Sequence, residues 1–337
     1  MELTFCMNTL LKTYLSKINF ILGRNPQVEK SDGFQQMIPE PYQAVFTISA
    51  DFELAWAWRY SKALENPVEA ALMKARRARK NTPVILELCE KYNIPITWAT
   101  VGHLFLEECH QENGKIHHQL PRLAHFENDY WQFENGDWFQ HDPGANYKTA
   151  PEWYAPDLIN EILKSPVDHE IACHTFSHID CRDHICPGEV FKAELNACKD
   201  AARSVGVELK TLIYPAHTVG NLDALTELGF TNYRSNDANT LGYPVLRNDG
   251  LWEIKSTMEL KFRDDWSIDY HIYRTKKVIE RAINHNASCH FWFHPSFSER
   301  YLNQVMPEVF QYLDSQRDEI WITSMKDYVN WLNTTSG

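Results

Sequence analysis

The sequence predicts an α/β fold of parallel βα units, either a barrel or an open sheet, from two observations. First, short apolar and β-branched runs alternate along the chain with longer segments of helical spacing, which is the order of successive βα units. Second, polar side chains follow directly after several of these runs, and the carboxyl ends of parallel strands meet on one face of a barrel. The 337 residues, 44% of them hydrophobic, are enough for one large core.

The first barrel elements follow a segment of different character. Residues 1–40 are predicted to be an N-terminal extension that contains a helix, and residues 41–335 the barrel domain. The barrel begins with a strand in "AVFTISADFELAW", which is apolar and β-branched and then turns acidic. Residues 66–93 have the apolar spacing of a helix, and "IPITWATVG" is again a strand.

The second half of the chain repeats the alternation. We expect strands in "HEIACH", "KTLIYPA", "TNYRSN", "ASCHFWFHP" and "IWIT". Helices are expected in "DLINEILKS", from Pro187 to Gly206, in "NLDALTELGF", over residues 268–286, over residues 302–318 and directly after "IWIT". Pro187 suits the first turn of a helix, and Gly206 suits a helix end.

A stretch of about residues 103–166 breaks the alternation and is predicted to be an ordered insertion over the active face, before the "HTFSH" motif. A loop of this length is usually functional or disordered, and its many aromatic residues argue against disorder. Trp131, Trp138 and Trp153 either stack on sugar rings or form a small core of the insertion itself, and the sequence leaves both readings open.

Charge and hydropathy exclude two classes of function. A net charge of -12 argues against sequence-independent binding of nucleic acid. No apolar run reaches the roughly 18 residues that a transmembrane span needs. Residues 1–24 lack the basic region and cleavage site of a secretory signal, so we expect a cytoplasmic protein. Because that segment is amphipathic, we interpret it as a helix that contacts the protein body, a partner or a membrane surface.

The eight cysteines are expected to be free thiols, because their spacings are irregular and no CxxC pair occurs. Cys173, Cys181 and Cys186 crowd the histidine motif. They are either soft metal ligands or small buried hydrophobic residues, and their spacing fits no common zinc pattern.

Two histidines and two carboxylates form the candidate centre. His174 and His178 in "DHEIACHTFSH" are four residues apart after a strand, so both imidazoles could bind one metal ion. Asp51 and Glu53 point the same way along an extended strand. One of them could bind the metal while the other takes a proton from water. His294, at the end of an apolar strand, could donate a proton to a leaving amine.

Together these motifs resemble those of the polysaccharide deacetylases of the NodB-homology class. "FTISADFE" resembles the first motif, "DHEIACHTFSH" the second, "LIYPAHTVGNLDALTELGF" the third and "FWFHPSF" the last, in matching order over about residues 44–300. The resemblance implies that the fold is a distorted (β/α) barrel of about seven parallel strands. It implies a divalent metal ion, often zinc, bound by an acid and two histidines. It also implies hydrolysis of an N-acetyl or O-acetyl group on a glycan.

The resemblance carries a role to each matching position. It implies metal binding by Glu53, His174 and His178, a general base at Asp51 and a general acid at His294. A backbone N–H near residues 214–216 would stabilise the oxyanion. Substrate contacts are expected from Tyr214, His217 and Trp266.

The sequence departs from the family pattern in two places. Phe52 separates the two acids that are usually adjacent, which leaves open which of them binds the metal. The third motif usually carries an arginine that orients the base, and "TLIYPAHTVG" has none; His217 or the later Arg234 could substitute. The "RDDW" at residues 263–266 is a partial match to the fourth motif, which commonly carries Asp and Trp.

The leading hypothesis is therefore a metal-dependent hydrolase that removes an N-acetyl or O-acetyl group from an amino-sugar glycan or its biosynthetic precursor. One alternative is an amide hydrolase that acts on a small cyclic amide or formyl substrate, with or without metal. Another is a non-catalytic carbohydrate-binding relative. The missing arginine favours the last alternative slightly, whereas the retained acids and histidines argue against it.

Overall fold

A computed structural model describes residues 14–15, 17–18, 20, 22, 25–29, 34–128, 130–133, 136–235 and 240–335. Most of the predicted contact segment, residues 1–24, lies outside these ranges, so the prediction of a membrane-surface or partner contact there stays untested. Within the described ranges, no helix has the length and apolar character to cross a membrane.

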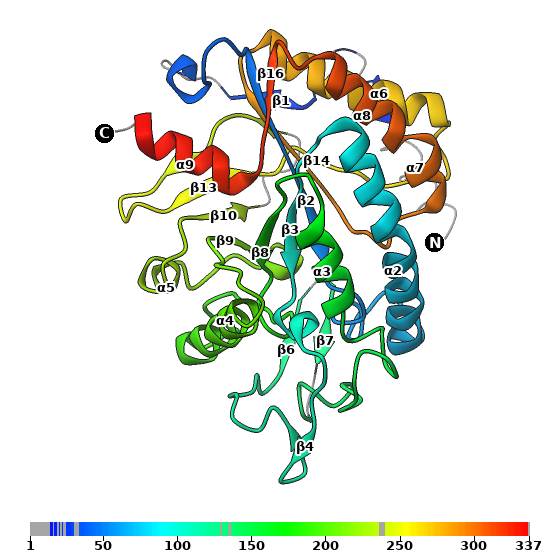
Figure 1. The fold of residues 1–337 in the computed structure, drawn as a ribbon, viewed down its shortest axis with the longest axis vertical. Coiled ribbons are helices and arrows are strands. Elements are labelled where there is room, and N and C mark those ends of the chain that lie inside the picture. Colours follow the sequence, from blue (N-terminus) through cyan, green and yellow to red (C-terminus); the bar gives the residue numbers. More distant parts are fainter. Residues whose placement is uncertain are drawn as a thin grey trace.

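One curled sheet of ten strands carries the fold (Figure 1). In spatial order the strands are β12 (Val245–Leu246), β13 (Trp252–Lys255), β10 (Asn232–Ser235), β9 (Thr211–Ile213), β8 (Glu170–Cys173), β3 (Thr97–Thr100), β2 (Ala44–Phe52), β15 (Ser288–Phe293) and β14 (Met258–Glu259), with β16 (Ile320–Ile322) paired to the start of β2. Among these strands, only the pairing of β12 with β13 is antiparallel. The predicted α/β class is confirmed, and the sheet forms a half-barrel.

β2 is an interior strand of the sheet and is buried over its whole length. All nine of its residues are buried, as expected for a parallel strand with both faces covered. It pairs with β15 through Val45–Ala50 and with β3 through Ser49–Phe52. The carboxyl end of β2, where the acidic residues begin, therefore emerges between two neighbouring strands.

Helices cover the outside of the sheet, as the alternation predicts (Figure 1). They are α2 (Pro67–Tyr92), α3 (Pro156–Lys164), α4 (Gly188–Arg203), α5 (Asp223–Glu227), α6 (Ile268–Asn284), α7 (Glu299–Gln304), α8 (Met306–Ser315) and α9 (Met325–Thr335). The expected helix over 302–318 is instead two helices that meet at Val305. Pro307 explains the break, because proline has no N–H to continue the hydrogen bonding of α7.

The insertion has little regular structure of its own. After the 3-10 turn η2 (Gly102–Phe105) it contains two short hairpins, β4 (Gln111–Glu112) with β5 (Lys115–Ile116) and β6 (Phe126–Glu127) with β7 (Gln132–Phe133). In Figure 1 it occupies the end of the molecule toward which β3 points. Trp131, Trp138 and Trp153 are all buried, so these tryptophans form a small core rather than exposed platforms for sugars.

Several short elements were not predicted. They are β12, β13 and β14, together with β1 (Gln27–Val28) and its partner β11 (Thr240–Leu241). Most have only two residues, which is too short for hydrophobic periodicity to register.

Candidate active site

The structure brings the three predicted metal ligands together. Glu53 follows β2 directly, and His174 and His178 lie in the loop after β8. Glu53 Oε2 lies 3.3 Å from His174 Nε2 and 2.9 Å from His178 Nε2. All three residues are buried, and one ligand atom from each lies within 4.8 Å of the others.

Backbone contacts fix the orientation of the two histidine rings. His174 Nδ1 lies 2.6 Å from the carbonyl oxygen of Ile213. Because a carbonyl only accepts, the proton sits on Nδ1 and the lone pair of Nε2 faces Glu53. Thr175 and His178 have φ angles of 58° and 59°, in the left-handed region that non-glycine residues seldom adopt. This bent loop turns both rings toward the same carboxylate.

Glu53 has the properties of a metal ligand. Its Oε1 atom is buried without a hydrogen-bond partner, and His294 Nε2 lies 3.3 Å from it. Burial would raise the pKa of Glu53, but His294 and His178 lower it well below its usual range, so the group is a carboxylate. One carboxylate and two imidazoles form a donor set that suits a catalytic divalent ion.

Asp51 is held by an arginine rather than by histidines. Arg234 Nη1 donates to Asp51 Oδ1 at 2.7 Å, and Nη2 donates to Oδ2 at 2.8 Å. Burial would raise the pKa of Asp51, but Arg234 overrides it and lowers the pKa to about 2. Arg234 Nη1 also donates to Ser49 Oγ at 2.8 Å. The arginine missing from the third motif is thus supplied by β10, where Arg234 lies in register with Ile213 of β9.

His294 completes the group from the opposite side. It follows β15, and its Nδ1 lies 4.0 Å from Glu259 Oε1. Its side chain is 22% exposed, whereas those of Asp51 and Glu53 are 6% exposed. His294 is therefore the predicted catalytic residue with the most access to solvent.

Comparison with known proteins gives a family likeness. The sequence profile described as polysaccharide deacetylase matches residues 72–235, a range that contains His174, His178 and Arg234 but not Asp51, Glu53 or His294. Over this range the chain is similar to the polysaccharide deacetylase family. The predicted enzyme class, a polysaccharide deacetylase-like hydrolase, is the class of that family. No curated protein matches the chain.

Solved structures of distant sequence share the fold of this chain. A Mycobacterium smegmatis protein assigned as a polysaccharide deacetylase has 13% identity and a TM-score of 0.62, over 89% of this chain and 93% of that one. A Pseudomonas aeruginosa PAO1 protein with the same assignment has 12% identity and a TM-score of 0.59, over 88% and 92%. PuuE allantoinase has 12% identity and a TM-score of 0.60, over 89% and 93%. These likenesses confirm the fold.

The three predicted substrate-binding residues occupy different surroundings. The Tyr214 ring stacks on Phe191 and its hydroxyl donates to the Gly220 carbonyl, so only its backbone is available to a substrate. His217 packs against Trp292, with the ring centres 4.8 Å apart. Burial and Arg234 lower the pKa of His217 to about 3.

Trp266 stands apart from the other predicted site residues. Its ring contacts are with Tyr270 and His271 on α6. Among the described residues, no hydrogen bond, ion pair or ring contact joins Trp266 to the acids or histidines of the centre. Its substrate role stays a prediction without support from the geometry.

Sequence reasoning missed a layer of aromatic and basic residues around the family motifs. Arg59 is buried between the rings of Trp56 and Trp138 and donates to the Ser177 carbonyl at 3.0 Å. The Trp131 ring lies 4.9 Å from that of His178. The aromatic run "FELAWAWRY", directly after the first motif, was the available signal for this layer.

The cysteines near the second motif are not ligands of the centre. Cys173, Cys181 and Cys186 are buried and free. None joins either of the two groups of possible metal ligands in the described part of the chain. The small-hydrophobe interpretation therefore holds for them.

Proposed function

We propose that the protein is a metal-dependent carbohydrate deacetylase that hydrolyses an N-acetyl, or O-acetyl, group of an amino-sugar glycan or its precursor. One observation carries the proposal. The two buried acids lie in different environments. Arg234 holds Asp51, whereas Glu53 faces His174 and His178. Two carboxylates with different partners can perform two different tasks.

Glu53, His174 and His178 would hold the metal ion, because Glu53 Oε2 and the two Nε2 lone pairs point to one another. A divalent ion at this position supplies Lewis acidity, which polarises a carbonyl and lowers the pKa of water. Zinc suits these nitrogen and oxygen donors.

Asp51 would accept the proton of the attacking water. Arg234 keeps it ionised and fixes its orientation through two hydrogen bonds, while each carboxylate oxygen retains a free lone pair for a further donor. This arrangement fits a general base, because such a group must first be positioned within hydrogen-bond reach of the proton that it accepts.

His294 would donate a proton to the departing amine. Its partial exposure lets it reach a substrate, and its Nε2 faces the same carboxylate as the metal-binding histidines. The backbone N–H groups near residues 214–216 would stabilise the oxyanion, where Ala216 and His217 have φ angles of 45° and 59°.

The test is acetate release from N-acetylated amino-sugar oligomers and nucleotide-linked N-acetyl sugars, with zinc-reconstituted protein. We expect turnover by the wild type, and loss of about 10²-fold or more in Asp51→Asn and His294→Ala. His285→Ala, at an exposed histidine at the end of α6, is the matched control. Activity that survives in both site variants, or hydrolysis of cyclic amides without metal, would contradict this proposal and favour the alternative amide hydrolase.

A further inference from the structure

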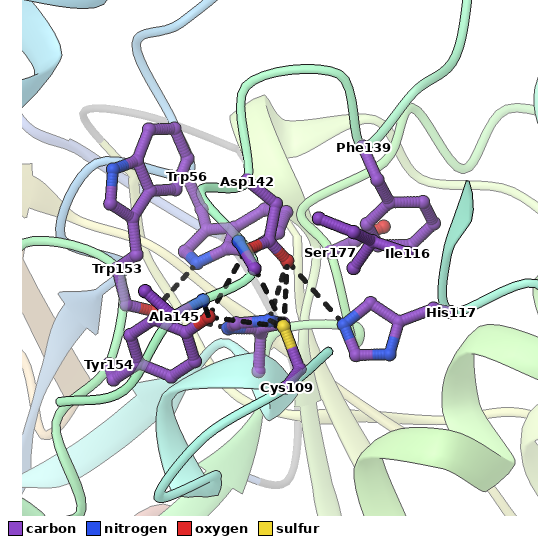
Figure 2. Close-up of polar contacts among 12 residues, drawn as sticks. Trp56, Cys109, Ile116, His117, Phe139, Asp142, Ala145, Trp153, Tyr154 and Ser177 are labelled. Carbon is purple, nitrogen blue, oxygen red and sulfur yellow. Dashed lines mark hydrogen bonds and ion pairs between the residues drawn. The ribbon is translucent and has the colours of Figure 1, made fainter. Parts of the chain in front are cut away.

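A second group of possible metal ligands lies within the insertion (Figure 2). His103 belongs to η2, Cys109 and His117 flank the β4–β5 hairpin, and Asp142 lies in the loop beyond β7. One ligand atom from each lies within 4.8 Å of the others. The side chains of His103 and Asp142 are 0% exposed and that of His117 is 8% exposed. We propose that these four residues bind a structural zinc ion, independently of the proposed catalytic site.

The distances between these atoms match a tetrahedral zinc site. Zinc bonds of about 2.1 Å to nitrogen or oxygen and about 2.3 Å to sulfur place tetrahedral ligand atoms roughly 3.4–3.6 Å apart. Cys109 Sγ lies 3.7 Å from His103 Nε2 and 3.5 Å from Asp142 Oδ2. His117 Nε2 lies 3.5 Å from the same Oδ2 atom. Only the contact of His103 Nε2 with Asp142 Oδ2 is shorter, at 2.8 Å.

The surrounding hydrogen bonds leave the proposed ligand atoms free to face one another. His103 Nδ1 lies 3.1 Å from the Trp153 carbonyl oxygen, so Nδ1 donates and Nε2 presents its lone pair to Asp142. Asp142 Oδ1 accepts from the Gly144 N–H at 3.0 Å and from the Tyr154 hydroxyl at 3.2 Å. An imidazole lone pair and a carboxylate oxygen that face each other require a cation or a proton between them.

His117 gives an independent indication of a ligand. Its Nε2 atom is buried and has no hydrogen-bond partner. A buried ring nitrogen without a hydrogen bond lowers the stability of the fold, because the nitrogen loses its hydration and gains no hydrogen bond in return. A metal ion would bind this nitrogen together with the other three atoms.

The same residues do not form a cysteine nucleophile site. In a catalytic triad the acid holds one histidine nitrogen and the nucleophile contacts the other. Here Cys109 and Asp142 both approach Nε2 of His103. Cys109 is also buried, so a substrate could not reach the sulfur. Convergence of several atoms on one point is the pattern of a metal site.

Zinc is the metal that this donor set favours. A thiolate, two imidazoles and a carboxylate leave no open position, which is typical of a structural rather than a catalytic site. The described part of the insertion before α3 has short hairpins as its strands, and a segment of this kind gains most from such a cross-link. Phe176, between the two histidines of the second motif, packs on the rings of His103 and His117 at 5.7 and 5.1 Å. The zinc would therefore support the loop that carries the catalytic ligands.

Cobalt substitution separates the two sites. A thiolate bound to Co²⁺ gives an intense ligand-to-metal charge-transfer band, and the candidate catalytic site contains no thiolate. We expect this band in the cobalt-loaded wild type and in His174→Ala/His178→Ala, but not in Cys109→Ser. Zinc content should fall by one equivalent in Cys109→Ser and stay unchanged in Cys89→Ser, a matched substitution of a buried cysteine on α2.

Two results would overturn the proposal. One is the absence of the charge-transfer band from the cobalt-loaded wild type, and the other is an unchanged zinc content in Cys109→Ser. If Cys109→Ser does not fold, X-ray absorption of zinc-loaded His174→Ala/His178→Ala decides, because it should show one sulfur neighbour at about 2.3 Å. Zinc with only nitrogen and oxygen neighbours, or no zinc at all, in that variant would also contradict the site. Failure of acetate release alone would leave it unaffected.

Discussion

Replacing Arg234 with methionine is the sharpest test of the acid pair. The substitution removes both hydrogen bonds to Asp51 and the one to Ser49. It leaves a carboxylate buried without its counter-charge, since the Asp51 side chain is 6% exposed. Loss of one partner of a buried ion pair destabilises a protein by about 3–5 kcal/mol. We expect the free energy of unfolding to fall by about that amount.

A second substitution separates the charge effect from lost packing. Asp51→Asn/Arg234→Met removes both charges, so it should be less destabilised than the sum of the two single variants by about 3 kcal/mol. Arg247→Met is the matched control. Its partner Asp249 lies 3.2 Å away at the surface, and exposed pairs contribute at most about 1 kcal/mol.

Urea unfolding of the wild type, the two single variants, the double variant and Arg247→Met gives these free energies. Additive effects of the Asp51 and Arg234 substitutions, or equal losses in Arg234→Met and Arg247→Met, would refute the reasoning that Arg234 compensates a buried charge. Arg234→Lys adds a test of geometry, because lysine keeps the charge but cannot form the two-pronged contact. We expect kcat to fall in Arg234→Lys even if the fold is retained.

Three further predictions concern metal binding, pH and the insertion. Glu53→Gln should lose one equivalent of zinc in elemental analysis, because it removes the only carboxylate of the site, and unchanged zinc would exclude Glu53 as a ligand. Burial lowers the pKa of His290 to about 3, so the unfolded chain takes up a proton below pH 6.5 that the folded chain resists. Stability should therefore fall from pH 6.5 toward pH 3, and His290→Gln should reduce this slope by roughly 1 kcal/mol per pH unit; an equal slope would contradict the assignment. Trp138→Phe removes the 2.8 Å hydrogen bond to Ser177 Oγ and should lower the unfolding free energy by about 1–2 kcal/mol in thermal denaturation, whereas no change would show that the bond contributes nothing.

The sequence predicted the location of the centre because strand order and strand ends are local properties. Each of the residues 51, 53, 174, 178 and 294 follows an apolar run that is long enough to be identified as a strand. Parallel connection then places those ends on one face without any knowledge of packing. The structure brings this predicted group together.

The contacts that these residues make with distant parts of the chain could not be predicted from any single segment of the sequence. Arg234 reaches Asp51 through the register of β10 on β9, across 183 residues of sequence. The four ligands of the proposed zinc site span residues 103–142 with irregular spacing, in a region without hydrophobic periodicity. Cys109 is one of eight cysteines, and their irregular spacing does not distinguish it from the others. Only the folded insertion shows that these side chains meet.

The loop between His174 and His178 links the two sites physically. Its left-handed residues, Thr175 and His178, each cost on the order of 1–3 kcal/mol. Such a conformation persists only where neighbouring groups fix it. The N–H groups of residues 102 and 103 donate to the carbonyls of residues 175 and 176, at 2.8 and 2.9 Å.

Glu194 holds the same loop from α4. It accepts from the Ser177 N–H at 2.8 Å and from the Ser177 hydroxyl at 2.6 Å. His103 therefore contacts both sites. Its backbone N–H restrains the loop between His174 and His178, and its side chain faces the proposed zinc. Release of that zinc would loosen one of the contacts that fix the orientation of His174 and His178. His103 of the insertion thus helps to hold the loop that carries His174 and His178 in place.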